Sequence, residues 1–306
     1  MALNTLGTLE GEFDEAQSDI ILLVEEPEIY QHPHKQKLVG EAFRTVCNEF
    51  NKTTGIRFQI AFATHSEKFL DISNFHTARI VRKETVEDIV QHSISALSIS
   101  ACSNYFAGLV NKEPMSDEAF TAKLHIFTRE ICEGFFAQKV ILVEGVTDKA
   151  VLEGYYASKN RDSLAEGTLI VSVEGKGKMD KPFYIFNQLG IPTFAVFDSD
   201  LNSNDKKIWA NTIIQQIAGV ENPVEYPSGC FDRFAAFEKN LEKYLKERCG
   251  DEFEGEFAAL SEQFGLPVSE ICKTPAAVAI VVKSMQEKGK TFPMFDQIID
   301  KVDQFN

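Results

Sequence analysis

Two segments of this 306-residue chain place carboxylates directly after a hydrophobic run. In the run VILVEG, Glu144 follows the last apolar residue, and Asp148 comes four residues after Glu144. The run FAVFDSD ends with Asp198 and Asp200. Carboxylate oxygens are preferred ligands of Mg²⁺, and the C-terminal ends of parallel strands meet at one edge of a sheet. The spacing therefore predicts a site for one or two divalent metal ions and chemistry on phosphodiesters.

Local geometry supports this prediction. Residues two apart on a strand project from the same face, so Asp198 and Asp200 point together while Ser199 points away. Asp148 falls in the first turn of the following helix, where the helix dipole favours a carboxylate. In the structural alternative, Asp148 only caps that helix and the aspartate pair only ends a strand. Each pattern alone is short, and the combination of the two favours the metal site.

From residue 138 onward, short hydrophobic runs alternate with segments of helical periodicity. Such alternation is typical of a parallel sheet with right-handed crossovers. The expected strands are 139–143, 168–173 and 193–197, and the expected helices between them are 149–158 and 181–189. Three further helices are expected at 231–248, 252–264 and 275–289.

A similar pattern precedes this one. Strands are expected at 19–24 and 58–63 around a helix within 32–50, followed by a strand at 77–83 and mostly helical structure over 93–136. The first strand leads into Glu25 and Glu26, and His65 follows the second. In P-loop ATPases, acids at such a strand end lie near the nucleotide's magnesium and the attacking water, and a histidine after the next strand senses the γ-phosphate. The alternative is a solvated acidic turn and a surface histidine.

These N-terminal motifs, which read EPEIYQHP and THS, resemble the C-terminal half of an ABC-type ATPase head. The phosphate loop G-x-x-x-x-G-K-[ST] does not occur in the chain, and no Ser-Gly-Gly signature segment precedes Glu25. We therefore expect the sequence to begin partway through an ATPase domain. The resemblance implies that Glu25, Glu26 and His65 contact ATP in the complete protein, and we expect no ATP hydrolysis by this chain alone.

The pattern E-G-x-x-D followed by D-x-D resembles the TOPRIM fold of topoisomerases, primases and certain nucleases. An ABC-type ATPase half followed by a TOPRIM domain is similar to the overcoming-lysogenization-defect (OLD) family of nucleases, class 2 type. The resemblance implies a metal-dependent DNA endonuclease or nickase with two Mg²⁺ or Mn²⁺ ions, and a role in phage defence. It places four metal ligands at Glu144, Asp148, Asp198 and Asp200. Asp148 stands where relatives often have glutamate.

The resemblance also implies an acidic ligand and a lysine from a helical insertion after the D-x-D strand. In FAAFEKNLEKYL the predicted ligand is Glu238, with Glu242 one helical turn later as its alternative. The predicted lysine is Lys273, which would stabilise charge on the phosphate, with Lys283 as its competitor. In the structural alternative, these side chains lie on solvated helix faces.

The loop EGKGKMDK lies between the middle strand and the aspartate pair. It supplies Lys176, Lys178 and Lys181 beside two glycines. Because glycine permits close approach and lysine supplies charge, the loop is predicted to contact the DNA backbone, with a plain flexible turn as the alternative.

Composition narrows the class of protein. The formal net charge of −15 argues against a protein that coats nucleic acid non-specifically, although an enzyme needs only one basic surface to grip DNA. No apolar run approaches the roughly 18 residues of a membrane span, and the acidic N-terminus does not look like a signal peptide. The six cysteines show no C-x-x-C pairs, so we expect reduced thiols and a cytoplasmic location.

The sequence thus predicts an α/β protein with a partial ABC-ATPase lobe at 1–92, a helical linker at 93–136 and a TOPRIM domain at 137–306. The TOPRIM domain is expected to hold a parallel, Rossmann-like sheet flanked by helices, with a helical insertion at about 231–290. We expect DNA as the partner, a homo-oligomer formed through the ATPase region, and no membrane. The rival functions are a nucleotide-dependent DNA-binding scaffold that does not cleave, and a topoisomerase- or primase-like fragment.

Overall fold

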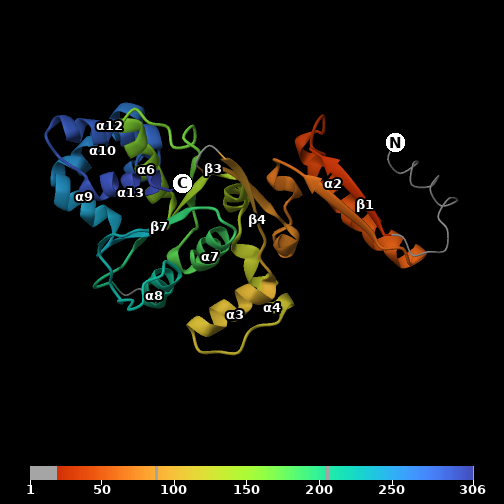
Figure 1. Cartoon of the computed structure of the whole chain (residues 1–306). Coiled ribbons are helices and arrows are strands. Elements are labelled where there is room, and N and C mark those ends of the chain that lie inside the picture. The colour runs from red at the N-terminus through yellow and green to blue at the C-terminus, as the bar shows by residue number, and fades with distance from the viewer. Residues whose placement is uncertain (1–18, 87–88, 204–206, 306) are drawn as a thin grey trace. The chain divides into compact units, whose positions relative to one another are not determined.

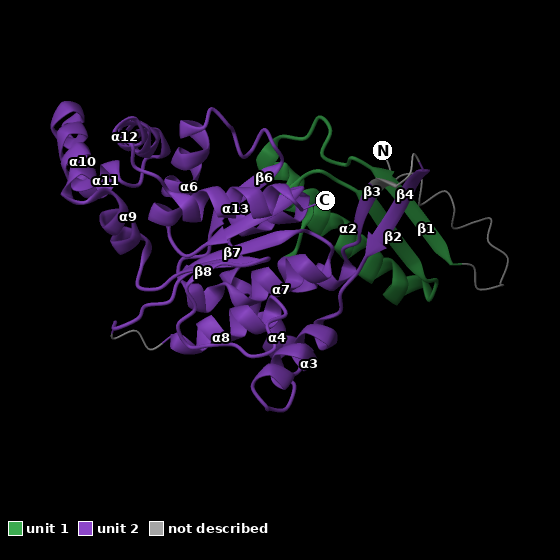
Figure 2. Ribbon diagram, turned by 60° about the vertical axis from the view of Figure 1, so that its left-hand side comes forward, with its two compact units in different colours: residues 1–71 green, residues 72–306 purple. Residues whose placement is uncertain are grey.

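The structure is a computed structural model that describes residues 19–86, 89–203 and 207–305 (Figure 1). The chain divides into two compact units, residues 1–71 and residues 72–306 (Figure 2). Within the described ranges, no helix combines the length and the apolar character that crossing a membrane requires. The domain limits expected from the sequence at residues 92 and 136 both fall inside the second unit and stay predictions.

The first unit is a strand–helix–strand arrangement, as the sequence predicts. Strands β1 (Ile20–Glu25) and β2 (Phe58–Ala63) pair in parallel, and helix α2 (Pro33–Thr54) connects them. The short 3-10 helix η1 (Glu67–Phe69) follows β2. Because the strands are parallel, the acids after β1 and the THS turn after β2 lie at the same edge of this sheet.

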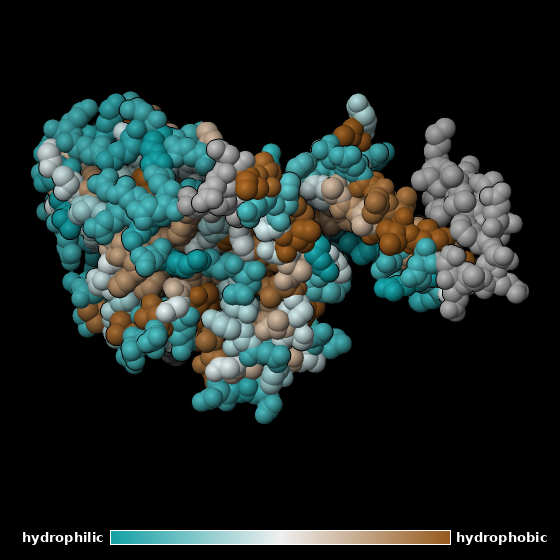
Figure 3. All heavy atoms as spheres, in the orientation of Figure 1, coloured by the Kyte–Doolittle hydropathy of each residue, from teal (hydrophilic) through white to brown (hydrophobic). Residues whose placement is uncertain are grey.

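One face of this two-stranded sheet is exposed. Side chains alternate along β1, and the outward-facing Ile21 and Leu23 are 61% and 76% exposed. On the other face, the rings of Phe50 in α2 and Phe58 in β2 lie 5.1 Å apart, and Phe58 is buried. Brown atoms along β1 mark the apolar exposed face (Figure 3). The core of this unit therefore lies between the sheet and α2.

The second unit is built on a five-stranded sheet in the order β6-β5-β7-β9-β8. Its first four strands in that order are parallel, and the edge strand β8 is antiparallel to β9. Strands β5 and β7 are neighbours, so their C-terminal ends lie side by side. The bounds are β5 (Lys139–Val143), β6 (Thr168–Ser172), β7 (Thr193–Asp198), β8 (Gly229–Cys230) and β9 (Phe234–Phe237).

Helices cover both faces of this sheet (Figure 2). Helices α6 (Val146–Ser158) and α13 (Pro293–Asp303) lie on one face, and α7 (Asp180–Gln188) and α8 (Ile208–Ile217) lie on the other. Strands β5 and β7 are almost wholly buried, which explains why they read as continuous apolar runs in the sequence. The strands and helices predicted between residues 139 and 197 are confirmed within a few residues at each end.

A layer of further helices packs on α6. Helix α12 (Pro275–Glu287) crosses α6 so closely that a Cβ added to Gly154 would lie 2.7 Å from Cβ of Val278. The predicted helices at 252–264 and 275–289 are thereby confirmed. The remaining members of this layer are α9 (Leu241–Cys249), α10 (Asp251–Phe264) and α11 (Val268–Ile271).

One predicted helix is wrong. The expected helix at 231–248 is a strand followed by a helix, because the four residues of β9 are all buried beside β7, and Asn240 then caps α9 by accepting a hydrogen bond from the Lys243 amide. The segment 93–136 is mostly helical, as expected, but its first three residues end strand β4 (Ile89–Ser95), which pairs antiparallel with β3 (Ile80–Val86). A four-residue apolar run is too short for periodicity to separate strand from helix.

Short helices follow this hairpin and lead to the main sheet. They begin after serine or threonine caps, whose hydroxyls accept a hydrogen bond from the amide three residues later. Their bounds are α3 (Ile99–Leu109), α4 (Asp117–Ala122) and α5 (Arg129–Glu133), and the 3-10 helices of this unit are η2 (Ile72–Thr77), η3 (Lys123–Ile126), η4 (Gly134–Phe136) and η5 (Lys176–Lys178).

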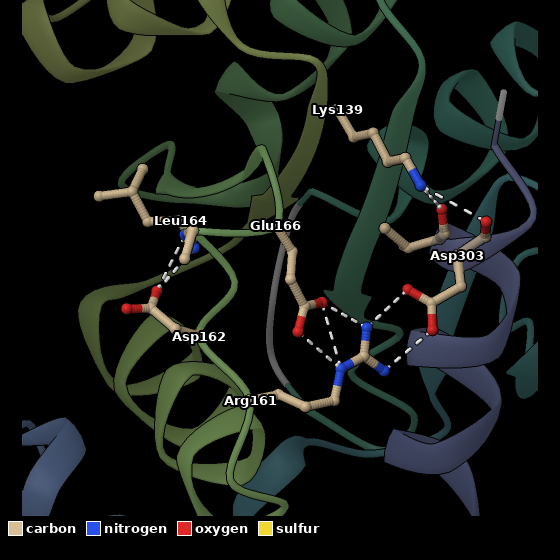
Figure 4. A network of polar contacts seen from close by, with 8 residues as sticks. Lys139, Arg161, Asp162, Leu164, Glu166 and Asp303 are labelled. Carbon is tan, nitrogen blue, oxygen red and sulfur yellow. Dashed lines mark hydrogen bonds and ion pairs between the residues drawn. The ribbon is translucent and has the colours of Figure 1, made fainter.

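An ionic network fixes the C-terminal helix (Figure 4). Arg161, which follows α6, donates to Glu166 at 3.0 Å and to Asp303 at 2.9 Å. Lys139 at the start of β5 donates to the main-chain oxygen of Val302 at 3.1 Å. The forked guanidinium binds both carboxylates at once, which holds α13 against the sheet.

Candidate active site

The predicted carboxylates converge at the C-terminal ends of β5 and β7. Glu144 directly follows β5, and its Oε2 accepts a hydrogen bond from the amide of Asp198, the last residue of β7, at 3.4 Å. Asp148 lies in the first turn of α6 and accepts from the Gly145 amide at 2.7 Å. Asp198 Oδ1 accepts from the Leu241 amide at 3.0 Å. Backbone donors therefore orient the carboxylates, and Asp148 serves as a helix cap within the same cluster.

Burial and mutual repulsion raise the pKa values of this cluster. Burial, followed by the charges of Asp148 and Glu144, raises the pKa of Asp198 to about 8. Burial, with the nearby charge of Glu144, raises the pKa of Asp148 to about 6. Burial also raises the pKa of Glu144. A group of half-buried acids that repel one another favours any cation that can enter.

One cation is already part of the cluster. Lys176 is fully buried, and its Nζ donates to the main-chain oxygen of Asp198 at 2.9 Å and to the carboxylate of Asp200. Asp200 and Glu174, which flank this contact, have φ angles of 59° and 56°. Such left-handed backbone is uncommon outside glycine and occurs at functional sites.

The position of Lys176 limits which lysines of the loop could contact the DNA backbone, as the loop is predicted to do. Lys176 is enclosed, and Lys181 binds Asp180 at 3.0 Å with its side chain largely covered. Lys178 is exposed and pairs with Glu174 at 3.0 Å. Of the three, Lys178 alone is exposed enough to contact a ligand from solvent. The sequence did not indicate the role of Lys176, because a lysine between two glycines reads as a surface turn.

The donor set fits a hard divalent cation by its chemistry. Its members are carboxylates held in place by backbone amides, and each keeps a second oxygen for a ligand. Throughout the part of the chain that the structure describes, no three acidic, histidine or cysteine side chains already form a complete ligand set.

The structure separates the two glutamates proposed for the insertion. They were expected on one helix face, and this premise is wrong: Glu238 follows β9 outside the helix, whereas Glu242 lies in the first turn of α9. The charge of Glu242 adds to the rise in the pKa of Asp148, so Glu242 is near the cluster. Glu238 stays the ligand predicted from the resemblance, and Glu242 is the one that the electrostatics favour.

Substitution can distinguish these glutamates. We expect Glu242→Gln to lower metal-dependent cleavage roughly 10- to 100-fold, the size of effect typical of residues that support a metal site. Glu238→Gln, which is matched in size and exposure, is expected to stay within about threefold of wild type by the same reasoning. Initial rates of plasmid nicking measure both variants. A large loss in Glu238→Gln with none in Glu242→Gln would reverse the assignment.

The charge of the predicted phosphate-binding lysine, Lys273, and that of Glu242 both act on the thiol of Cys272. Lys273 is exposed after α11, and its charge lowers the pKa of Cys272, although burial of this thiol raises its pKa overall. The charge of Glu242 acts to raise the pKa of the same thiol. Lys283 lies on the exposed surface of α12. The role of Lys273 on the phosphate stays a prediction.

The acids of the first unit form a second constellation. His65 Nε2 lies 3.6 Å from Glu26 Oε1, and Glu26 has a φ of 43°. Glu25 ends β1 with its side chain exposed. The three residues predicted to contact ATP therefore gather at one edge of the β1–β2 sheet.

Glu28 organises this edge, and the sequence analysis did not single it out. Its carboxylate accepts from Thr64 Oγ1 at 2.8 Å and from the His65 amide at 2.6 Å. Burial acts to raise the pKa of Glu28, but these hydrogen bonds outweigh it and hold the pKa below its ordinary value. The second glutamate of the E-P-E motif was the available signal, because it joins the two motifs.

Comparison with known proteins found matches in both parts of the chain. The sequence profile of the OLD-like TOPRIM domain, described as overcoming lysogenization defect protein-like, matches residues 135–200, and that of an AAA ATPase domain matches residues 7–70. The chain is 27% identical over 186 residues to the OLD nuclease of Thermus scotoductus, covering 61% of this chain and 32% of that protein. It is 28% identical over 189 residues to the Old nuclease of Escherichia phage P2, covering 61% and 29%.

A third relative is the endonuclease GajA of Bacillus cereus, 25% identical over 191 residues, with 60% of this chain and 27% of that protein covered. The chain thus spans about a third of the length of these curated relatives. Among solved structures, it is similar to the C-terminal region of the Burkholderia pseudomallei OLD protein, with a TM-score of 0.40, 14% identity, and 55% of this chain and 98% of that chain covered. The chain thus contains a region that matches an OLD-like TOPRIM domain and a region that matches an AAA ATPase domain, and it is similar to nucleases of the OLD family.

Proposed function

We propose that this chain is a metal-dependent DNA endonuclease or nickase whose active site is the carboxylate cluster of the second unit. The observation that carries the proposal is the meeting of Glu144, Asp148 and Asp198 at the ends of two neighbouring parallel strands. The printed names of the relatives, OLD nuclease and endonuclease GajA, support hydrolysis of phosphodiesters.

In this proposal, Glu144, Asp148, Asp198 and Asp200 hold one or two Mg²⁺ or Mn²⁺ ions, with Glu242 or Glu238 from the insertion. When bound, such ions activate water and stabilise the leaving oxygen. The backbone amides of Gly145, Asp198 and Leu241 keep the carboxylates oriented, which limits the reorganisation that ligand binding requires.

Lys273 has a separate role in this proposal. Its ammonium would neutralise negative charge that develops on the nonbridging oxygens of the phosphate. The support is its exposed position beside Cys272, where the charge of Glu242 is also felt.

A plasmid assay tests the function. With Mn²⁺ or Mg²⁺ we expect nicking that chelator abolishes, and Asp200→Asn should lower it more than about 100-fold because a metal ligand is lost. The matched control is Asp232→Asn, an exposed aspartate that pairs with Lys301 outside the cluster. Wild-type rates in Asp200→Asn would refute the assignment. Binding of DNA without cleavage would favour the scaffold, and relaxation with religation would favour a topoisomerase-like fragment.

The first unit would couple ATP to cleavage in a complete protein, through Glu25, Glu26 and His65. For this chain alone we expect no ATP turnover above background, because it contains no glycine-rich phosphate loop. Phosphate release measured with wild type and Glu26→Gln checks this. Turnover that disappears in the variant would contradict the prediction.

We infer that DNA is the partner from the nuclease relatives and the TOPRIM match. Assembly into a homo-oligomer through the ATPase region, a cytoplasmic location and a role in phage defence stay predictions. Sedimentation of the purified chain over a concentration series tests the first of these.

A further inference from the structure

An exposed tryptophan lies beside the carboxylate cluster. Trp209 is the single tryptophan of the chain and lies in the first turn of α8. Half of its surface, 50%, is exposed. An aromatic side chain left exposed beside a polar site is typical of a binding surface.

Helix α8 is anchored to the aspartate segment. Asn211, two residues after Trp209, is fully buried, and its Nδ2 donates to the main-chain oxygens of Ser199 at 2.9 Å and Glu225 at 2.8 Å. Ser199 stands between the two aspartates of the cluster and is itself fixed by a hydrogen bond to Pro227. The start of α8 is therefore held in a defined position next to the cluster.

Trp209 also borders the loop that carries Lys176. A Cβ added to Gly177 would lie 3.6 Å from the indole ring and 3.4 Å from Cδ of Lys207. Two residues earlier in the loop, the Gly175 amide donates to the main-chain oxygen of Glu144 at 2.8 Å. The glycine backbone thus leaves space for the indole ring and connects it to the first carboxylate of the cluster.

Positive charge accompanies the ring. Lys207 is exposed, and its Nζ would lie 3.4 Å from a Cβ added to Gly175. Lys178 follows Gly177 and has 41% of its side chain exposed. Within a chain of net charge −15, an exposed aromatic ring with lysines in the adjoining segments resembles the surfaces that bind unpaired nucleic-acid strands. In such surfaces the ring stacks on a base and the lysines contact phosphates.

We propose that Trp209 stacks on an unpaired base of the DNA strand that is presented to the carboxylate cluster, while Lys207 and Lys178 contact its phosphates. The inference rests on the proposed nuclease function, which supplies DNA as the ligand. It adds that the bound strand is unpaired. A base inside a duplex has both faces covered by its neighbours, so a duplex would engage Trp209 only where it is opened. Because every base offers a π face, the contact is expected to tolerate any sequence.

The single tryptophan makes a direct test possible. The purified chain is titrated in EDTA, which prevents metal-dependent cleavage, with a single-stranded oligothymidylate while tryptophan fluorescence is recorded. We expect saturable quenching, since stacking on a base changes the surroundings of the indole. A hairpin duplex of equal length and a strand of abasic deoxyribose phosphates are expected to quench far less. Quenching of equal size by the abasic strand would overturn the stacking proposal.

Variants give a second readout, anisotropy of a labelled single strand. Trp209→Ala is expected to weaken binding roughly 5- to 100-fold, and Trp209→Phe, which keeps an aromatic face, to retain most of the affinity. The matched control is Phe264→Ala at the end of α10, where an aromatic side chain is 49% exposed outside this surface. Equal affinity of wild type and Trp209→Ala would overturn the proposal.

Cleavage measured separately with Mn²⁺ distinguishes failure of this inference from failure of the proposed function. Quenching and Trp209-dependent binding without cleavage would support the stacking site and refute the nuclease. Cleavage that depends on Asp200, with no quenching and full binding by Trp209→Ala, would support the nuclease and refute the stacking site.

Discussion

Replacing Asp198 by asparagine is expected to abolish cleavage and, without divalent metal, to make the second unit more stable. The residue lies among half-buried acids whose charges repel its own, so the neutral amide removes repulsion while keeping the shape of the side chain. We expect cleavage to fall more than about 100-fold, and the midpoint of thermal unfolding in chelator to rise by about 2–4 °C, the usual gain when a strained site is relaxed. Calorimetry and plasmid nicking measure the two effects.

The same substitution is expected to change how stability depends on pH. Folding raises the pKa of Asp198 from 3.8 to about 8, so the folded chain binds more protons than the unfolded chain between these values. In chelator, the free energy of unfolding should therefore fall as pH rises through this window, and Asp198→Asn should flatten the fall. The control, Asp232→Asn, changes an exposed carboxylate and should leave the slope as in wild type. A variant less stable than wild type in chelator would contradict the repulsion.

Replacing Lys176 by methionine is expected to produce the largest loss of stability of any single substitution considered. Its ammonium is fully buried and bonds to Asp198 and Asp200, so the variant leaves these groups without their cation. Removing one partner of a buried ion pair costs about 3–5 kcal/mol. Added Mn²⁺ should restore part of this loss, because it can replace the missing positive charge. Urea unfolding with and without Mn²⁺ measures both quantities.

Two further variants keep this prediction testable. Lys178→Met removes a lysine from the same loop, but its partner Glu174 is on the surface, so we expect a change within about 0.5 kcal/mol. The double variant Lys176→Met/Asp200→Asn removes both charges of the buried pair and should recover much of the stability. If Lys176→Met unfolds at the same urea concentration as wild type, the ammonium is not required to balance the cluster.

The strands that position the site were readable from the sequence because their signal is local. Strands β5 and β7 are buried on both faces and therefore appear as continuous apolar runs, and each ends at an acid. Strand β9 was missed, since FAAF is short and its pairing with β7 connects residues 39 apart. The expected shared helix face of Glu238 and Glu242 was wrong for the same reason.

Burial was the quantity that local sequence could not supply. The segment GKGK reads as a solvated turn, yet the fold places Lys176 at 0% exposure between the aspartates and leaves Trp209 half exposed nearby. The contacts of Glu28 likewise depend on the pairing of β1 with β2. This pairing brings Glu28 against Thr64 and His65, which follow it by 36 and 37 residues in the sequence.

By itself, the sequence determined the order of the elements and the acids at their ends, because apolar periodicity and strand-end carboxylates are properties of neighbouring residues. Only the tertiary structure decided which charges balance those acids and which face beside them stays open. It placed Lys176 among the carboxylates, let the charge of Glu242 act on Asp148, and left Trp209 exposed at the glycine loop. These outcomes depend on how distant segments exclude water from one another, and that is fixed by packing of the whole unit.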